Sequence, residues 1–299
     1  MLQTAKRLAI GVSAIVGVSA IAVRPASAFT ISGTDYLLYD TCSPTTTCLN
    51  PSANLNSILA GNSSNPGGNI ELFASSEGVG NAAYLASSAR TSISGEVGGK
   101  TLTLSSLTAD DWFNTGSGIS TAYGVANLAN TWFNDFLSAA GKGGASLLER
   151  TQAFNAFLGL GGFQRSSDPN ISYVATEGSD IKIGLAGHFD LKAYYTRPGS
   201  PFAGFAQMLP NGFQASEVVK ANYDGVTKFL YSFSATASGL TNSAGVGADG
   251  SSHSGNYEVA LRGVVTPPPP TADVPEPSAL LGLAAVGGLF AAKRKLKNA

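Results

Sequence analysis

The stretch NYEVALRGVV, residues 256–265, alternates apolar and polar side chains over most of its length. Successive side chains of a β-strand point to opposite faces of the sheet, so this period of two predicts a strand with one buried face. A second stretch, KFLYSFSA at residues 228–235, has the same pattern. The apolar positions are Tyr257, Val259, Leu261 and Val265 in the first stretch and Phe229, Tyr231 and Phe233 in the second. The body of the chain is therefore expected to be rich in β-structure.

Shorter apolar runs predict further strands along the body. They cover residues 34–39, 70–74, 100–107, 171–174, 181–186, 189–195 and 216–223. Three dipeptides, Asn211-Gly212, Asp224-Gly225 and Asp249-Gly250, predict tight turns, because Gly and Asn accept the positive φ that such turns need.

A helical block is predicted around residues 121–160. Between 121 and 140 the apolar side chains recur every three or four residues, and Gly141 is placed to end that helix. A second helix is expected from Ser146, because Ser146 and Glu149 have the spacing of a capping box, in which both side chains bind free backbone N–H groups. The two amphipathic helices predict a hairpin that lies over a sheet.

The order of the elements indicates the fold class. Strands come first, then two or three helices, then strands again, without the regular alternation of a parallel doubly wound sheet. We expect an α+β fold, mainly antiparallel β in one sheet or a sandwich, with the helical hairpin as an insertion. A short echo, WFN, occurs at Trp112 and at Trp132, and both tryptophans are assigned to the core.

The N-terminus has the three parts of a secretory signal. Lys6 and Arg7 precede an apolar run from residue 8 to residue 23, and the segment ends in Ala26-Ser27-Ala28. Small residues at Ala26 and Ala28 fit the cleft of signal peptidase, so cleavage is expected after Ala28. A retained membrane anchor is the alternative.

The C-terminus has an equally distinct organisation. A proline-rich linker at 267–273 precedes Val274-Pro275-Glu276-Pro277, an apolar segment at 278–292 and a basic tail at 293–299. Fifteen helical residues span only about 22 Å, less than the roughly 30 Å of a bilayer core. The basic tail resists translocation and should stay in the cytoplasm, so a transient hold in the inner membrane is expected, with an ordinary tail anchor as the alternative.

The motif VPEPS, followed by an apolar helix and a KRK cluster, resembles the PEP-CTERM sorting signal over residues 274–299. The resemblance implies recognition by an exosortase, a membrane cysteine protease, and release into or attachment within an exopolysaccharide-rich surface layer. The WFN stretches and SDPNISY, residues 167–173, also resemble uncharacterised cyanobacterial PEP-CTERM proteins, a resemblance that implies no activity.

The body that remains, residues 29–266, is mildly acidic. Seven of the chain's 18 Lys and Arg residues but only two of its 19 Asp and Glu residues lie in the terminal segments, which leaves the body a net charge of about −6. Nucleic-acid binding requires clustered basic residues, so nucleic acid is not an expected partner. The expected partners are signal peptidase, exosortase and exopolysaccharide.

The two cysteines, Cys42 and Cys48, are separated by five residues that include Pro44. In an exported chain this spacing favours a local disulfide. Neither cysteine has a histidine nearby in sequence or the spacing of a zinc site, and no metal or cofactor is expected.

The chain has few residues suited to catalysis. Its two histidines, His188 and His253, lie in no nucleophile or zinc motif, and no phosphate-binding or calcium-binding loop is present. On a strand, His188 and Asp190 would share a face and could act as a base and its carboxylate, although a chance pairing explains the pattern as well. No catalytic residue is assigned.

Aromatic residues provide a different route to function. Tyr194 and Tyr195 flank a Pro/Gly loop at residues 197–201, where exposed rings could stack on sugars; the alternative is that they are the ends of strands and part of the core. We expect a non-catalytic structural or adhesive protein of the cell envelope, cell surface or extracellular matrix, with a secreted carbohydrate-binding protein or hydrolase of the same layer as the alternative.

Overall fold

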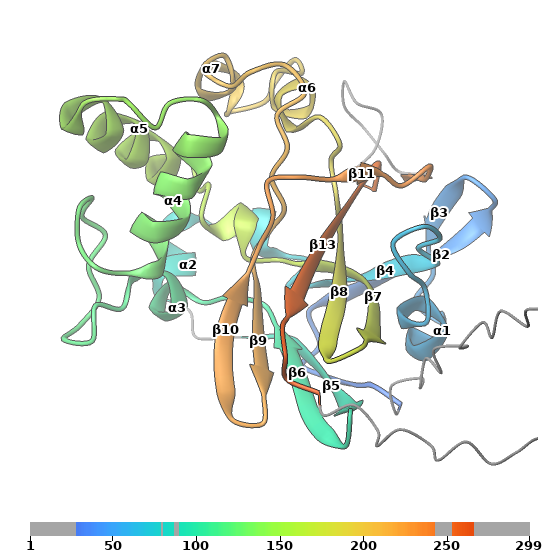
Figure 1. The fold of residues 1–299 in the computed structure, drawn as a ribbon. Coiled ribbons are helices and arrows are strands. Elements are labelled where there is room, and N and C mark those ends of the chain that lie inside the picture. Colours follow the sequence, from blue (N-terminus) through green and yellow to red (C-terminus); the bar gives the residue numbers. More distant parts are fainter. Residues whose placement is uncertain (1–27, 79, 87–89, 243–252, 266–299) are drawn as a thin grey trace, which may run out of the picture.

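The computed structural model describes residues 28–78, 80–86, 90–242 and 253–265. In this part of the chain the fold is mainly antiparallel β, with two sheets and a smaller helical part (Figure 1). One sheet has the strand order β1-β5-β6-β9-β10 and the other the order β11-β13-β8-β7-β4-β2-β3-β12. The paired strands run antiparallel except for the short pair of β12 and β3, which is parallel. The expected predominance of antiparallel β-structure is confirmed.

The five-stranded sheet consists of β1 (Thr30–Ser32), β5 (Ser92–Val97), β6 (Lys100–Ser105), β9 (Val219–Tyr223) and β10 (Val226–Leu230). The eight-stranded sheet consists of β2 (Tyr36–Ser43), β3 (Thr46–Leu49), β4 (Gly68–Leu72), β7 (Asn170–Glu177), β8 (Asp180–Gly187), β11 (Thr236–Ala237), β12 (Thr241–Asn242) and β13 (Gly255–Leu261). The helices are α1 (Leu55–Leu59), α2 (Asn81–Ala86), α3 (Ala109–Phe113), α4 (Leu128–Ala139), α5 (Leu147–Gly159), α6 (Leu191–Tyr195) and α7 (Ala203–Ala206), with 3-10 turns η1 (Ser76–Gly78) and η2 (Gln164–Ser166).

An aliphatic core lies between the two sheets. Ile93 and Leu102 from the five-stranded sheet pack in one cluster with Ile70, Ile171 and Ile183 from the eight-stranded sheet, and all five side chains are fully buried. Burial of each such side chain stabilises the fold by about 1.5–3 kcal/mol. The alternation of apolar and polar side chains therefore gives each sheet an apolar face, and these two faces pack against each other.

A second cluster, which we call the aromatic cluster, gathers beside the sheets around the helices. It is built from the buried rings of Trp112, Phe113, Trp132, Phe133, Phe136, Phe154, Phe157, Phe163, Phe202, Phe205 and Phe213. Helices α4 and α5 meet through it, with a distance of 5.3 Å between the ring centroids of Phe133 and Phe154. Both tryptophans are buried, as predicted.

The helix ends show how local sequence sets these elements. Ser146 and Glu149 form the predicted capping box at the start of α5. The preceding helix, α4, begins at Leu128 rather than near residue 121, because the Asn127 side chain accepts a hydrogen bond from the Asn130 N–H and caps the helix there. Thr108 and Asp111 make a second capping box, at the start of α3.

The predicted strand at 189–195 is wrong. The Asp190 carboxylate accepts a hydrogen bond from the Ala193 N–H, and this cap starts the helix α6 in place of a strand. Conversely, β1, β3, β5, β11 and β12 were not predicted, and the strand predicted at 228–235 ends at Leu230 as β10.

The β2–β3 hairpin carries the predicted disulfide. Cys42 and Cys48 are bonded, with a distance of 5.8 Å between their Cα atoms. The predicted turn at Asp224-Gly225 joins β9 to β10, and both residues have positive φ. This two-residue turn is the type expected between antiparallel strands.

No helix within the described ranges is long and apolar enough to cross a bilayer. Several predicted features lie outside the described residues: the signal segment as far as residue 27, the Asp249-Gly250 turn, the proline-rich linker, the sorting motif with its apolar segment and the basic tail. Ala28, the last residue of the predicted signal, is described and exposed.

Candidate functional site

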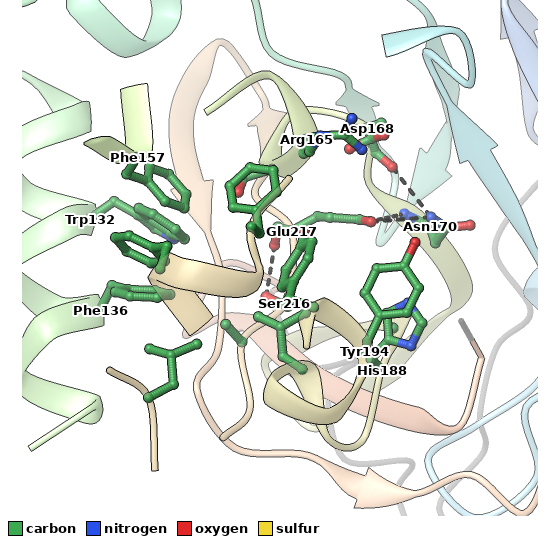
Figure 2. A pocket seen from close by; sticks show the side chains of 18 of the residues that line it. Trp132, Phe136, Phe157, Arg165, Asp168, Asn170, His188, Tyr194, Ser216 and Glu217 are labelled. Atoms are coloured by element: carbon green, nitrogen blue, oxygen red, sulfur yellow. Dashed lines mark hydrogen bonds between the residues drawn. The ribbon is translucent and has the colours of Figure 1, made fainter. Parts of the chain in front are cut away.

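A cavity of about 220 Å³ lies where the aromatic cluster meets the eight-stranded sheet. Its two sides differ in chemistry. Rings of α4 and α5, among them Trp132 and Phe157, form one side, whereas Arg165, Asp168 and Asn170 lie on the other (Figure 2). The cavity thus offers both an apolar aromatic surface and a group of charged and amide side chains.

The polar side follows from the alternation of β4. Ile70 and Leu72 point into the aliphatic core, so Asn69 and Glu71 face the other way. Glu71 is the cross-strand partner of Asn170 on β7, which places two polar side chains next to each other on this face of the sheet. Polar residues therefore reach the cavity without interrupting the core on the opposite face.

Glu217 is held in place by Asn170. The Asn170 backbone N–H donates to Glu217 Oε2 at 3.0 Å, and the Asn170 side-chain amide donates to the same oxygen at 3.2 Å. Glu217 precedes β9 in a segment fixed to η2, because the Val218 N–H donates to the Ser166 carbonyl. Figure 2 shows the Glu217 side chain extending toward Asn170.

A chain of buried hydrogen bonds continues from Asn170 into the sheet. The Asn69 amide donates to Asn170 Oδ1 at 2.5 Å and to His253 Nε2 at 3.2 Å. Because Nε2 accepts, the proton of the neutral imidazole is on Nδ1, which donates to Thr47 Oγ1 at 2.7 Å. We call these residues, Thr47, His253, Asn69 and Asn170 with Glu217, the polar chain.

His253 is kept neutral by its surroundings. Burial, and to a smaller extent the neighbouring His188, lowers the pKa of the His253 imidazole to about 3. Neutral His253 can accept from Asn69, whereas the protonated ring could not. The polar chain therefore depends on the uncharged form of this residue.

Asp168 reaches the cavity from the segment between η2 and β7. The Ser76 hydroxyl donates to Asp168 Oδ2, and both residues are buried. The preceding residue, Ser167, accepts a hydrogen bond from the Trp112 indole at 2.7 Å. The stretch SDPNISY thus supplies buried polar groups that join the aromatic cluster to the polar side of the cavity.

The predicted ligand-binding tyrosines both line the cavity, but neither is an exposed loop residue. Tyr194 and Tyr195 lie on α6 and are half-buried. The Tyr194 ring is stacked on His188 at 3.6 Å between centroids, and the Arg197 guanidinium lies 3.6 Å from the same centroid. Two groups so close to one ring must occupy opposite faces, so both faces of the Tyr194 ring are covered and cannot stack on a sugar.

His188 and Asp190 do not form the pair considered above. Asp190 caps α6, whereas His188 is buried in the cavity wall against Tyr194. Within the described ranges, no group of three or more His, Cys, Asp and Glu side chains is placed to hold a metal ion. Of the processing residues, Ala26 and those at 274–277 lie outside the described part of the chain.

Sequence reasoning did not identify Glu71, Asp168, Asn170 or Glu217 as site residues. One local signal was available. In NIEL, residues 69–72, polar residues alternate with apolar ones, and this strand lies between β2 and β7 in the sheet. Glu217, in contrast, follows an irregular segment, and nothing in its neighbouring residues indicates a cavity.

No family model, curated protein or solved structure matches the chain. The function is therefore inferred from the site.

Proposed function

We propose that this chain is an exported protein of the cell envelope or extracellular matrix that binds a saccharide unit of the exopolysaccharide layer in its cavity, in a non-catalytic role. In this proposal the signal at 1–28 is removed. The tail at 274–299 is held briefly in the inner membrane, with its apolar segment at 278–292 helical, and is then processed by an exosortase.

The two ends of the packed body support these processing boundaries. Phe29, the first residue after the proposed cut, is buried in the aliphatic core, and its backbone N–H donates to Asn56 Oδ1 at 2.6 Å. At the other end, Val265 is also buried, and its N–H donates to the Ser179 carbonyl at 2.9 Å. Cuts outside these residues would leave the core intact.

The size of the cavity supports a single small unit as ligand. The cavity has a volume of about 220 Å³. Sites for drug-sized ligands are larger, about 300–1,000 Å³. One sugar ring suits this volume, whereas a polysaccharide chain would need an open groove.

The proposal of saccharide binding rests on the buried indole of Trp132. Trp132 lines the cavity and is 1% exposed, and its Nε1–H has no hydrogen-bond partner among the described residues. A buried donor left in this state costs about 1–3 kcal/mol. A sugar combines an apolar ring face for the aromatic side with hydroxyl oxygens that could accept from this donor.

The test uses Trp132→Phe, which keeps an aromatic ring but removes the donor. Affinity for saccharide units released from the host's matrix, measured by calorimetry, should fall about threefold to tenfold, the range of one neutral hydrogen bond. Trp112→Phe is the matched control, because the Trp112 indole donates to Ser167 and does not line the cavity. Equal affinity of Trp132→Phe and the wild type would contradict the proposal.

The export part is tested separately by the intact mass of the protein recovered from the matrix. The expected product begins at Phe29 and lacks the basic tail. Recovery of the full-length chain from the inner membrane alone would refute it.

The hydrolase alternative is favoured by one observation: three carboxylates, Glu71, Asp168 and Glu217, line the same cavity. Glycoside cleavage commonly uses two carboxylates on either side of the scissile bond. Release of reducing sugar from matrix polysaccharide by the wild type, and its loss in Glu217→Gln, would support hydrolysis over simple binding.

A further inference from the structure

The groups that line the cavity have an excess of negative charge. Glu71, Asp168 and Glu217 contribute three carboxylates, against the one guanidinium of Arg165. The only other ionisable nitrogen in the lining belongs to His188, which carries at most one positive charge. With His188 neutral, the lining has a formal charge of −2.

A nearby cation reduces this excess without removing it. Arg197 lies against Tyr194 on the ring face opposite His188. Counting Arg197 as well, the site still carries a net negative charge when His188 is neutral. Because charges interact more strongly in a partly enclosed site than in water, this balance should favour a positively charged ligand over a negatively charged one.

Glu217 is the carboxylate best prepared to bind such a ligand. The backbone and side chain of Asn170 both donate to it, and Asn170 is itself fixed by Asn69, which also donates to His253. Amide donors orient a carboxylate without adding a positive charge to the site. Since the polar chain fixes the position of Glu217 before a ligand arrives, little side-chain freedom is lost on binding.

The aromatic side of the cavity is compatible with a cation as well. The Arg165 guanidinium lies 5.6 Å from the centroid of the Phe202 ring, within the range of a cation–π contact. A positive group that enters the cavity would meet further ring surfaces at Trp132 and Phe157. Both sides of the cavity therefore favour positive charge.

We propose that the saccharide unit taken up by this cavity carries a protonated amine, which binds the Glu217 carboxylate, so that the preferred ligand class is amino sugars. This inference rests on the proposed saccharide binding. It predicts an order among sugars of the same size: an amino sugar first, a neutral sugar second and an acidic sugar last.

The experiment compares glucosamine, glucose and glucuronate in calorimetric titrations of the purified protein, in buffer near neutral pH in which most of the amine is protonated. Glucosamine should bind at least about tenfold more tightly than glucose, as expected when a neutral hydrogen bond becomes charge-assisted. Glucuronate should bind most weakly of the three.

Glu217→Gln sharpens the test, because it preserves the shape of the side chain and an acceptor for Asn170 while it removes the charge. In this variant the affinity for glucosamine should fall to that for glucose. Glu96→Gln is the matched control, since Glu96 is exposed on β5 and does not line the cavity. If Glu217→Gln fails to fold, the order of the wild-type affinities for the three sugars tests the proposal by itself.

The outcomes separate the two proposals. Equal affinity for glucose and glucosamine would overturn the inference about amino sugars and leave saccharide binding in place. Failure of all three sugars, and of the units released from the matrix, would overturn both. An unchanged preference for glucosamine in a folded Glu217→Gln variant would exclude Glu217 as the group that binds the amine.

Discussion

The aliphatic core and the aromatic cluster fill the interior of the molecule in different ways. Between the sheets, pleated strands bring branched side chains such as Ile93 and Ile183 together. In the aromatic cluster, rigid rings meet at many angles, for example 76° between Trp112 and Trp132 and 8° between Phe133 and Phe136. The cavity lies at the edge of the second region, where rings meet polar groups of the sheet. The strands therefore set the course of the backbone, whereas the rings form one wall of the cavity.

The largest expected effect comes from truncation of the central ring of the cluster. Trp132→Ala should lower the free energy of unfolding by about 3–5 kcal/mol, because it removes a fully buried ring that contacts, among others, Phe136 and Phe157. Ile183→Val, the comparison in the aliphatic core, should cost only about 0.5–1.5 kcal/mol. Urea unfolding of both variants measures the difference. Similar losses would show that the cavity-lining ring contributes little to packing.

The disulfide should have an intermediate effect, confined to the edge of the eight-stranded sheet. Replacing Cys42 and Cys48 with Ser should lower the free energy of unfolding by about 2 kcal/mol, the value expected from the chain entropy of so short a loop. Saccharide affinity should not change, because neither cysteine lines the cavity. A change in affinity without a change in stability would show that the hairpin acts on the site.

The smallest effect, counted per unit of pH, is the change in the free energy of unfolding that His253 of the polar chain causes. The folded pKa of His253 is about 3, below the ordinary value of about 6.5, so the unfolded chain binds a proton in this window and the folded one does not. Stability should therefore fall as pH falls from about 6.5 toward 3, by at most about 1.4 kcal/mol per pH unit from this group.

His253→Gln provides the comparison for that prediction. Its unfolding free energy should vary less steeply between pH 6.5 and 3 than that of the wild type, while carboxylates elsewhere contribute equally to both proteins. Parallel curves for the two proteins would contradict the assignment of a neutral, buried His253.

The sequence predicts the local elements of this fold better than it predicts the cavity. The strand of Tyr257 and Val259 was predicted because its alternation is local and one face is buried. The capping box of Ser146 was predicted for the same reason, since both partners lie within one helical turn.

The cavity depends on contacts that no local pattern contains. Asn69 and Asn170 are 101 residues apart, and Asn69 and His253 are 184 apart. Tyr194 was selected for its aromatic ring, yet its place in the cavity follows from the Asp190 cap, which turns a predicted strand into a helix. The pairing of β4 with β7 brings Glu71 and Asn170 together.

If the leader is removed after Ala28, as proposed, the burial of Phe29 constrains the order of events during maturation. Its side chain packs against Gly95, where a Cβ atom would come within 2.9 Å of the ring, and the adjoining residues of β1 pair with β5. A peptidase needs an extended, accessible segment around the bond that it cuts, so cleavage beside this residue has to come before β1 closes on its neighbour. Under the proposed processing, a chain whose β1 paired with β5 before cleavage would keep its leader.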